Sequence, residues 1–157
     1  DRKYNDLKLI LAGSPGWLYQ DILKSAKMSP YASDIVFWGK VRAEDRALLY
    51  NLAKAFVYPS FFEGFGFQPL EAQASGCPVV VSDRTSLPEV VGDSALKVNP
   101  WNLDEIAGAI HQAVGPSRER LIEMGLENIK RFSWEKTARQ TLEILQNAQK
   151  VSRHTSS

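Results

Sequence analysis

Two glutamates flank a glycine-containing loop near the middle of this 157-residue chain. The loop contains Gly64 and Gly66, and Glu63 and Glu71 stand on either side with seven residues between them. Glycines let the backbone approach a ligand closely, and Pro69 suits the first turn of a helix, where its missing N–H costs nothing. The N–H groups at such a helix start attract phosphate, whereas carboxylates accept hydrogen bonds from sugar hydroxyls. This pattern favours a nucleoside diphosphate or a nucleotide sugar as the ligand.

Each part of this loop has a simpler interpretation when it is taken alone. A Gly-x-Gly pair before a helix is often a tight turn, and Glu71 can be an exposed residue that the helix dipole stabilises. The dinucleotide fingerprint is not met, because Gly64 and Gly66 are followed by Pro69 instead of a third glycine. The loop therefore argues against nicotinamide binding. Taken without the segments on either side of it, the loop does not indicate one particular function.

The segments around the loop predict an α/β fold, with a Rossmann-like parallel sheet covered by helices on both faces. Short runs that are apolar throughout, as in strands buried on both faces, alternate with segments of helical periodicity. The expected strands are 7–12, 34–38, 55–58, 79–81 and 96–98. The expected helices are 17–25, 43–53 and 68–75, and three more that begin near the N-cap candidates Asn102, Ser117 and Ser133.

The loops that follow the strands are the expected place for a ligand. In open parallel sheets, ligands bind beyond the carboxyl ends of the strands. The four loops in that position are 13–16, 39–41, 59–67 and 82–89. Lys40 and Arg84 lie on two of them and could assist an anion, although charged loop residues are more often simply solvated.

Composition excludes several classes of function. The chain is 44% hydrophobic and 24% charged, as one globular domain would be, and its net charge of +1 gives no reason to expect nucleic acid as a partner. A single cysteine, Cys77, permits no intrachain disulfide and is expected to pack as a small apolar residue. The single cysteine suits a reducing compartment, so a cytoplasmic location is expected, and no apolar run approaches the ~20 residues of a membrane span. No residue cluster has metal-ligand spacing, so no metal is expected.

Taken with its flanks, the loop resembles the signature of the glycosyltransferase family 4 type of GT-B enzymes. The matching text includes the E-x7-E spacing from Glu63 to Glu71, VYPS at 57–60, EAQASGCPVV at 71–80, LPEVVGD at 87–93 and FSWE at 132–135. The resemblance runs from about residue 7 to about residue 145. It implies the carboxyl-terminal, donor-binding half of a GT-B fold, ending in helices, in a two-domain retaining enzyme.

The resemblance also implies roles for individual residues. Glu63 corresponds to the glutamate beside the donor hexose and is the expected catalytic residue, whereas Glu71 corresponds to the glutamate on the ribose. The other expected donor-binding residues are Gly64, Phe65, Gly66, Phe67, Leu70, Gly39, Lys40 and Val41. Two positions depart from the family, which usually has Leu or Val at Phe67 and Met at Gln73. The Arg and Lys that neutralise the diphosphate are expected upstream of Asp1.

The resemblance therefore implies an enzyme that transfers a mannose-type or glucose-type hexose from GDP-mannose or a UDP-sugar to an acceptor hydroxyl, without another cofactor. Residues 1–150 are the expected donor domain, without its first strand, and 151–157 a frayed polar tail. The expected partner is the missing amino-terminal acceptor domain, and peripheral contact of that domain with the inner membrane face stays open. This chain alone is expected to be inactive. The alternatives are a silent nucleotide-binding fragment and a GT-B nucleotide-sugar epimerase.

Overall fold

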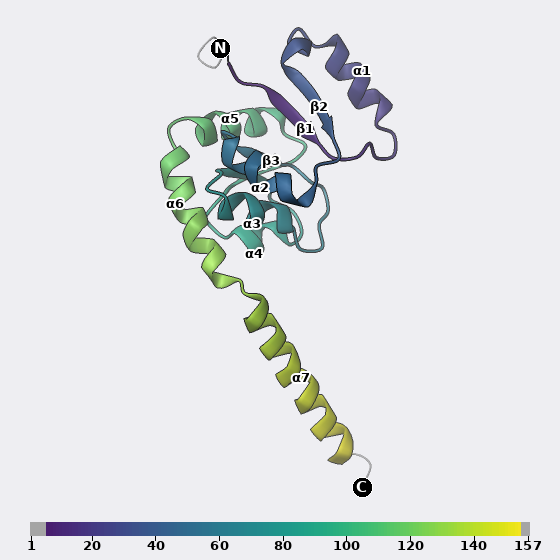
Figure 1. Cartoon of the computed structure of the whole chain (residues 1–157), viewed down its shortest axis with the longest axis vertical. Coiled ribbons are helices and arrows are strands. Elements are labelled where there is room, and N and C mark those ends of the chain that lie inside the picture. The colour runs from purple at the N-terminus through teal and green to yellow at the C-terminus, as the bar shows by residue number, and fades with distance from the viewer. Residues whose placement is uncertain (1–5, 155–157) are drawn as a thin grey trace. The chain divides into compact units, whose positions relative to one another are not determined.

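The computed structural model describes residues 6–154, with side chains described as far as residue 149. The chain divides into two compact units, Asp1–Arg46 and Ala47–Ser157, and each is described by itself (Figure 1). Helix α2 (Ala43–Leu52) crosses the boundary between them. Among the described residues, no helix is both long enough and apolar enough to cross a membrane.

The first unit is a parallel strand pair with a helical connection. Leu9 lies opposite Ile35 and Leu11 opposite Phe37, and the register shifts at the last pair, where Ala12 lies opposite Gly39. No described side chain of this unit is fully buried. Its elements are β1 (Leu9–Ala12), α1 (Gln20–Met28), the 3-10 helix η2 (Ala32–Asp34) and β2 (Ile35–Gly39).

The second unit contains a three-stranded parallel sheet in the order β3-β4-β5. Its central strand is buried along its whole length, because neighbouring strands flank it and helices cover both of its faces. The strands are β3 (Phe56–Tyr58), β4 (Val79–Ser82) and β5 (Leu96–Val98). The helices are α3 (Phe67–Ala74), α4 (Leu87–Val91), α5 (Leu103–Val114), α6 (Arg118–Asn128), η3 (Ile129–Arg131) and α7 (Trp134–His154).

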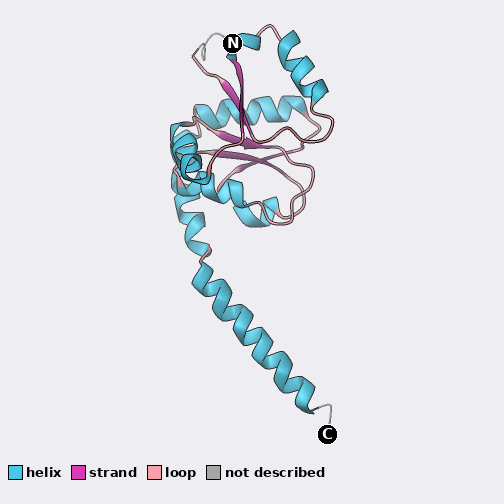
Figure 2. Ribbon diagram, turned by 45° about the vertical axis from the view of Figure 1, so that its right-hand side comes forward, coloured by secondary structure: helices cyan, strands magenta, loops and turns pink. Residues whose placement is uncertain are grey.

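Alternation along β4 divides the core of this unit between the two faces of the sheet. Val79 and Val81 pack in one cluster with residues of α3 and α4, whereas Val80 packs in the other with residues of α5 and α6. Figure 2 shows helices on both faces of these strands. The predicted fold class, α/β with parallel strands and helices on both sides, is confirmed.

Several elements differ in detail from the sequence prediction. The strands fall into two separate ladders rather than one sheet, and each ladder belongs to a different unit. Helix α4 was not predicted, and α1 begins at Gln20 rather than near Trp17. Helix α7 continues through residues 151–154, which the sequence assigned to a frayed tail; residues 155–157 lie outside the described part.

The three predicted N-cap residues behave differently. Asn102 caps α5, because its Oδ1 accepts hydrogen bonds from the backbone N–H groups of Asp104 and Glu105 at 3.1 and 3.2 Å. Ser133 Oγ accepts a hydrogen bond from the backbone N–H of Lys136 at the start of α7, at 3.3 Å. Ser117 occupies the N-cap position of α6, but its side chain makes no capping hydrogen bond.

Candidate functional site

Glu63 lies in the loop from β3 to α3 and is fixed by both its side chain and its backbone. Its Oε1 accepts a hydrogen bond from Tyr58 Oη at 2.6 Å, and its side chain is half-buried. Its backbone N–H donates to Thr85 Oγ1 at 3.1 Å, while its backbone carbonyl accepts from Ser86 Oγ at 3.0 Å. The loop after β4 therefore anchors the residue that the sequence predicts to be catalytic.

Tyr58 is well suited to orient the Glu63 carboxylate. Burial raises the pKa of the Tyr58 hydroxyl, and the hydrogen bond to Glu63 and the negative charge of Glu63 raise that pKa further. The hydroxyl therefore stays protonated at neutral pH and donates to the carboxylate. One Glu63 oxygen is engaged by Tyr58, so the carboxylate is held in one orientation beside the glycine-containing loop.

Thr85 reaches Glu63 from an uncommon backbone conformation. Its φ is +52°, in the left-handed region that a β-branched residue rarely adopts. Such backbone strain persists only where surrounding contacts outweigh it, and it occurs often at functional sites. Here the conformation accompanies a 3.1 Å hydrogen bond from the Glu63 backbone to Thr85 Oγ1.

The N-terminus of α3 offers backbone N–H groups for an anion. Gly66 is the N-cap residue with φ +93° in the left-handed region, and no side chain caps the helix. Phe67 and Gln68 are the first two helical residues, whose N–H groups have no partner within the helix, and Pro69 has no N–H. The helix start thus combines uncommitted donors with a partial positive charge.

The two glycines of the loop serve different purposes. A Cβ atom on Gly66 would lie 2.6 Å from Leu87 Cδ2, so the chain's own packing requires glycine there. A Cβ atom on Gly64 would have no atom within 4 Å, and Gly64 is exposed. The packing of the chain does not explain Gly64, which leaves open space beside Glu63.

Aromatic side chains continue from the glycine-containing loop to the start of α7. The Phe65 and Phe67 rings lie 4.7 Å apart, and Phe65 meets the Phe132 ring edge-on at 6.0 Å. The Phe67 ring stacks on Trp134, also at 6.0 Å. Phe67, where the family usually has Leu or Val, therefore has a packing role in this chain, because its ring stacks on Trp134, the first residue of α7.

Leu70 and Glu71 are neighbours in the middle of α3. Glu71 is half-buried, and Tyr50 Oη of α2 donates a hydrogen bond to its Oε2 at 3.3 Å. Leu70 packs against the core cluster that contains Val79 and Val81. Glu63 and Glu71 thus belong to one loop-and-helix segment, and each accepts a hydrogen bond from a tyrosine hydroxyl.

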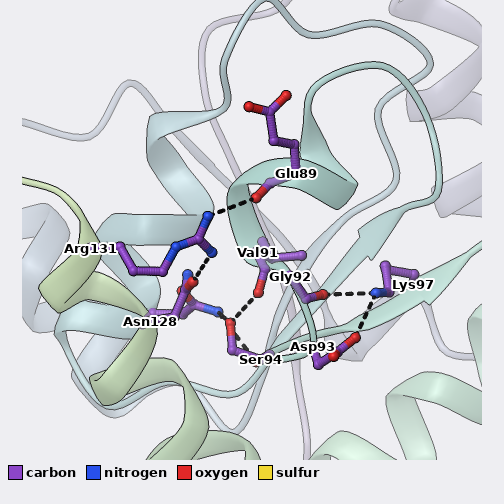
Figure 3. A network of polar contacts seen from close by, with 9 residues as sticks. Glu89, Val91, Gly92, Asp93, Ser94, Lys97, Asn128 and Arg131 are labelled. Carbon is purple, nitrogen blue, oxygen red and sulfur yellow. Dashed lines mark hydrogen bonds and ion pairs between the residues drawn. The ribbon is translucent and has the colours of Figure 1, made fainter.

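A buried polar network joins Gln73 of α3 to residues outside this helix. Figure 3 shows the part of this network around Ser94, Asn128 and Arg131. Gln73 Nε2 donates to Ser94 Oγ at 2.6 Å, and Gln73 Oε1 accepts from Asn128 Nδ2 at 2.9 Å. Asn128 Oδ1 accepts in turn from Arg131 at 2.7 Å. Gly125 of α6 lets that helix approach Gln73, because a Cβ atom there would lie 3.1 Å from the Gln73 side chain. The glutamine at this position therefore joins α3 to α6 and to the loop that follows α4.

Replacing Gln73 with alanine is expected to lower the free energy of unfolding by about 1–3 kcal/mol. The substitution leaves a cavity at a position that is 1% exposed and removes partners from the Asn128 and Ser94 side chains. Urea denaturation measures the change. The control is Gln68→Ala on the same helix, which should change stability by less than about 0.5 kcal/mol. Equal stabilities of the two variants would contradict the network's role.

The remaining predicted site residues are placed as follows. Gly39 ends β2 in the first unit with φ +78°, and its carbonyl accepts from the Gly13 N–H at 2.8 Å. Lys40 is exposed and Val41 half-buried, both in the first unit. The predicted contact of these three residues with the base therefore stays a prediction. Arg84 is exposed, and its guanidinium pairs with Asp83 at 3.0 Å.

Cys77 is a packing residue, as expected. It is 1% exposed, and burial raises the pKa of its thiol to about 11, although the positive charge of Arg118 acts in the opposite direction. The thiol is therefore protonated at neutral pH. His111 lies on α5, away from the β3–α3 loop in sequence. Within the part of the chain that the structure describes, no three His, Cys, Asp or Glu side chains are grouped to hold a metal ion.

Four side chains of the site were not identified from the sequence. Tyr58 and Tyr50 donate to the two glutamates, and Thr85 and Ser86 anchor the Glu63 backbone. The 82–89 loop was recognised as a candidate, but no spacing rule points to its hydroxyl residues. The position of Tyr58 at the end of the predicted strand, directly before the candidate loop, was the one sequence feature that could have indicated its role.

Comparison with known proteins shows which family this chain resembles. The family model described as "Glycosyl transferases group 1" matches residues 1–115. The O-antigen chain mannosyltransferase B of Escherichia coli is 43% identical over 136 residues, which are 85% of this chain and 36% of that protein. The chain thus spans about a third of that relative.

Solved structures resemble this chain over most of its length. Sucrose-phosphate synthase from Thermosynechococcus elongatus has a TM-score of 0.81 and 26% identity over 92% of this chain and 39% of its own. Anabaena HepE, in a complex with UDP, has a TM-score of 0.76 and 22% identity over 90% of this chain and 41% of its own. The second likeness concerns the fold alone.

Proposed function

The chain belongs to the group 1 glycosyltransferase family, and from this premise we propose that it is the donor-binding domain of a retaining hexosyltransferase that uses a nucleoside-diphosphate sugar. One observation carries the proposal: α3 begins without a side-chain cap, between two half-buried glutamates that tyrosine hydroxyls orient. This segment provides N–H donors for a diphosphate and carboxylates for the hydroxyls on either side of it.

We propose a mannose-type donor first, with GDP-mannose as its form and a UDP-sugar as the alternative. The proposal of mannose rests on the relative named an O-antigen chain mannosyltransferase, which is 43% identical. The HepE structure contains UDP, which supports a nucleotide as the ligand of this fold. The acceptor hydroxyl and the domain that holds it belong to the longer protein.

In this proposal each group acts on a different part of the donor. The bond between the anomeric carbon and the diphosphate breaks, and its electron pair leaves with the diphosphate. The N–H groups at the start of α3 stabilise that growing negative charge, most effectively where water is excluded. Glu63 lies beside the hexose, which develops positive charge, and Glu71 accepts hydrogen bonds from the ribose hydroxyls. The acceptor hydroxyl oxygen forms its bond to the anomeric carbon on the face that the diphosphate leaves, and its proton passes to the departing diphosphate. No covalent sugar–enzyme intermediate forms.

Replacing Tyr58 with phenylalanine in the full-length protein is expected to lower kcat about tenfold, because Glu63 loses a charge-assisted hydrogen bond that orients it. Affinity for the nucleoside diphosphate should not change. Tyr50→Phe is the matched control, since it removes the hydrogen bond to Glu71 instead and should weaken nucleotide binding while sparing kcat. Steady-state kinetics and calorimetry separate the two effects, and wild-type transfer by both variants would contradict these assignments.

Two alternatives predict different products. A silent nucleotide-binding fragment would bind the donor and release nothing, as is expected of this chain on its own, whereas a GT-B epimerase would return an altered nucleotide sugar. Incubating the full-length protein with GDP-mannose and an acceptor mixture, followed by mass analysis, separates them. A glycoside product supports the transferase, and an isomerised donor supports the epimerase.

A further inference from the structure

An exposed aromatic cluster lies at the carboxyl edge of the sheet in the second unit. It consists of Phe61, Arg84 and Trp101, which come from the loops after β3, β4 and β5 respectively. The Phe61 and Trp101 rings lie 4.7 Å apart at 35°, and the Arg84 guanidinium lies 5.2 Å from the Trp101 ring centroid. Phe61 is 58% exposed and Trp101 64% exposed. Three adjacent loops thus present two neighbouring aromatic rings, tilted to each other, and a guanidinium to solvent.

Trp101 is held in this exposed position by a hydrogen-bonded loop. Its backbone N–H donates to Asn99 Oδ1 at 3.1 Å, and the Asn99 N–H donates to Glu105 Oε2 at 2.9 Å. Asn102, the next residue, caps α5, and Pro100 is buried. The loop therefore fixes the Trp101 backbone while its large side chain contributes little to the core. Exposed apolar surface of this kind commonly marks a binding site.

The cluster is continuous with the Glu63 site. Phe61 precedes Glu63 by two residues, and Arg84 directly precedes Thr85, which accepts the hydrogen bond from the Glu63 backbone. Ser82 Oγ donates to the Ser60 carbonyl at 2.5 Å and so ties the base of the Phe61 loop to the end of β4. The loops after β3 and β4 that hold Glu63 therefore also carry Phe61 and Arg84.

We propose that Phe61, Arg84 and Trp101 form a stacking subsite for a pyranose ring of the acceptor glycan other than the ring that carries the attacking hydroxyl, which the acceptor domain of the longer protein holds. This inference rests on the proposed transferase function. The C–H face of a pyranose packs on aromatic rings, which provide large, rigid contact areas. Asp83 pairs with Arg84, so the polar groups at the rim are neutral as a pair and suit an uncharged sugar better than a phosphate. The donor groups are already assigned to α3 and to the two glutamates.

The test is a titration of the 157-residue chain, followed through the indole N–H signals of its tryptophans. The probes are α-linked mannotriose, maltotriose and GDP. A trisaccharide should move the Trp101 signal saturably, and GDP should not. Trp101→Ala should weaken trisaccharide binding about threefold to tenfold, whereas Trp101→Phe, which keeps an aromatic ring, should weaken it less. Trp17→Ala, at a residue that is 93% exposed in the first unit, is the matched control and should bind normally.

Two results would overturn the subsite. One is a Trp101 signal that neither trisaccharide moves, and the other is a signal that moves with GDP alone, which would assign the rings to the nucleotide. A different result would contradict the proposed function itself: GDP would leave the amide signals of residues 64–68 unchanged. Saturable movement with a trisaccharide, lost in Trp101→Ala and retained in Trp17→Ala, supports the subsite.

Discussion

Replacing Gly66 with alanine is expected to destabilise the second unit by about 2–5 kcal/mol. The residue has φ +93°, and an added Cβ atom would lie 2.6 Å from Leu87 Cδ2. Leu87 is fully buried, so its side chain has little room to move away. Because Gly66 is the N-cap residue of α3, the distortion acts on the proposed phosphate site, and nucleotide affinity should fall as well. Urea denaturation and calorimetry measure the two effects.

Gly64→Ala is the matched control for this prediction. Its Cβ atom would meet no protein atom within 4 Å, so the free energy of unfolding should change by less than about 0.5 kcal/mol. Donor affinity should nevertheless fall, since the added methyl group occupies the space beside Glu63. If Gly66→Ala were as stable as Gly64→Ala, the helix start would not have the geometry described.

Replacing Glu71 with alanine is expected to lower the affinity for both nucleoside diphosphate and nucleotide sugar by about 10-fold to 150-fold. This loss corresponds to roughly 1.5–3 kcal/mol of binding free energy. The carboxylate accepts a hydrogen bond from Tyr50 and is half-buried, so it is already oriented before the ligand arrives. Calorimetry with GDP and GDP-mannose measures the loss, and circular dichroism confirms that the variant folds.

Glu63→Ala is the partner experiment and should behave differently. Affinity for the nucleoside diphosphate should stay nearly unchanged, while kcat of the full-length protein falls, because the contact strengthens only as the hexose develops positive charge. Equal losses of diphosphate affinity in the two variants would contradict this division of roles. Normal transfer by both would contradict the site itself.

The sequence was sufficient where local chemistry decides the structure. The buried run at 79–81 became the central strand β4, and Asn102 caps α5 as its residue type predicts. The start of α3 was also predicted closely, because glycine and proline mark that boundary. The cysteine between a helix end and a strand proved to be a buried packing residue.

The parts that the sequence did not predict depend on contacts between distant segments. Glu63 and Thr85 are 22 residues apart, and Tyr50 and Glu71 are 21 apart, so only the tertiary fold shows that they meet. Helix α4 was missed because five residues are too few to show a helical period. The role of Gln73 could not be foreseen either, since its partner Asn128 is 55 residues away.

We propose above that a nucleoside diphosphate binds at the start of α3, between the two glutamates. The most direct test is titration of the isotope-labelled chain with GDP and with UDP, followed by amide chemical shifts. We expect the largest shift changes at residues 64–68 and at Glu71, and a weaker response in Glu71→Ala. Changes confined to α5, α6 and α7 would contradict it.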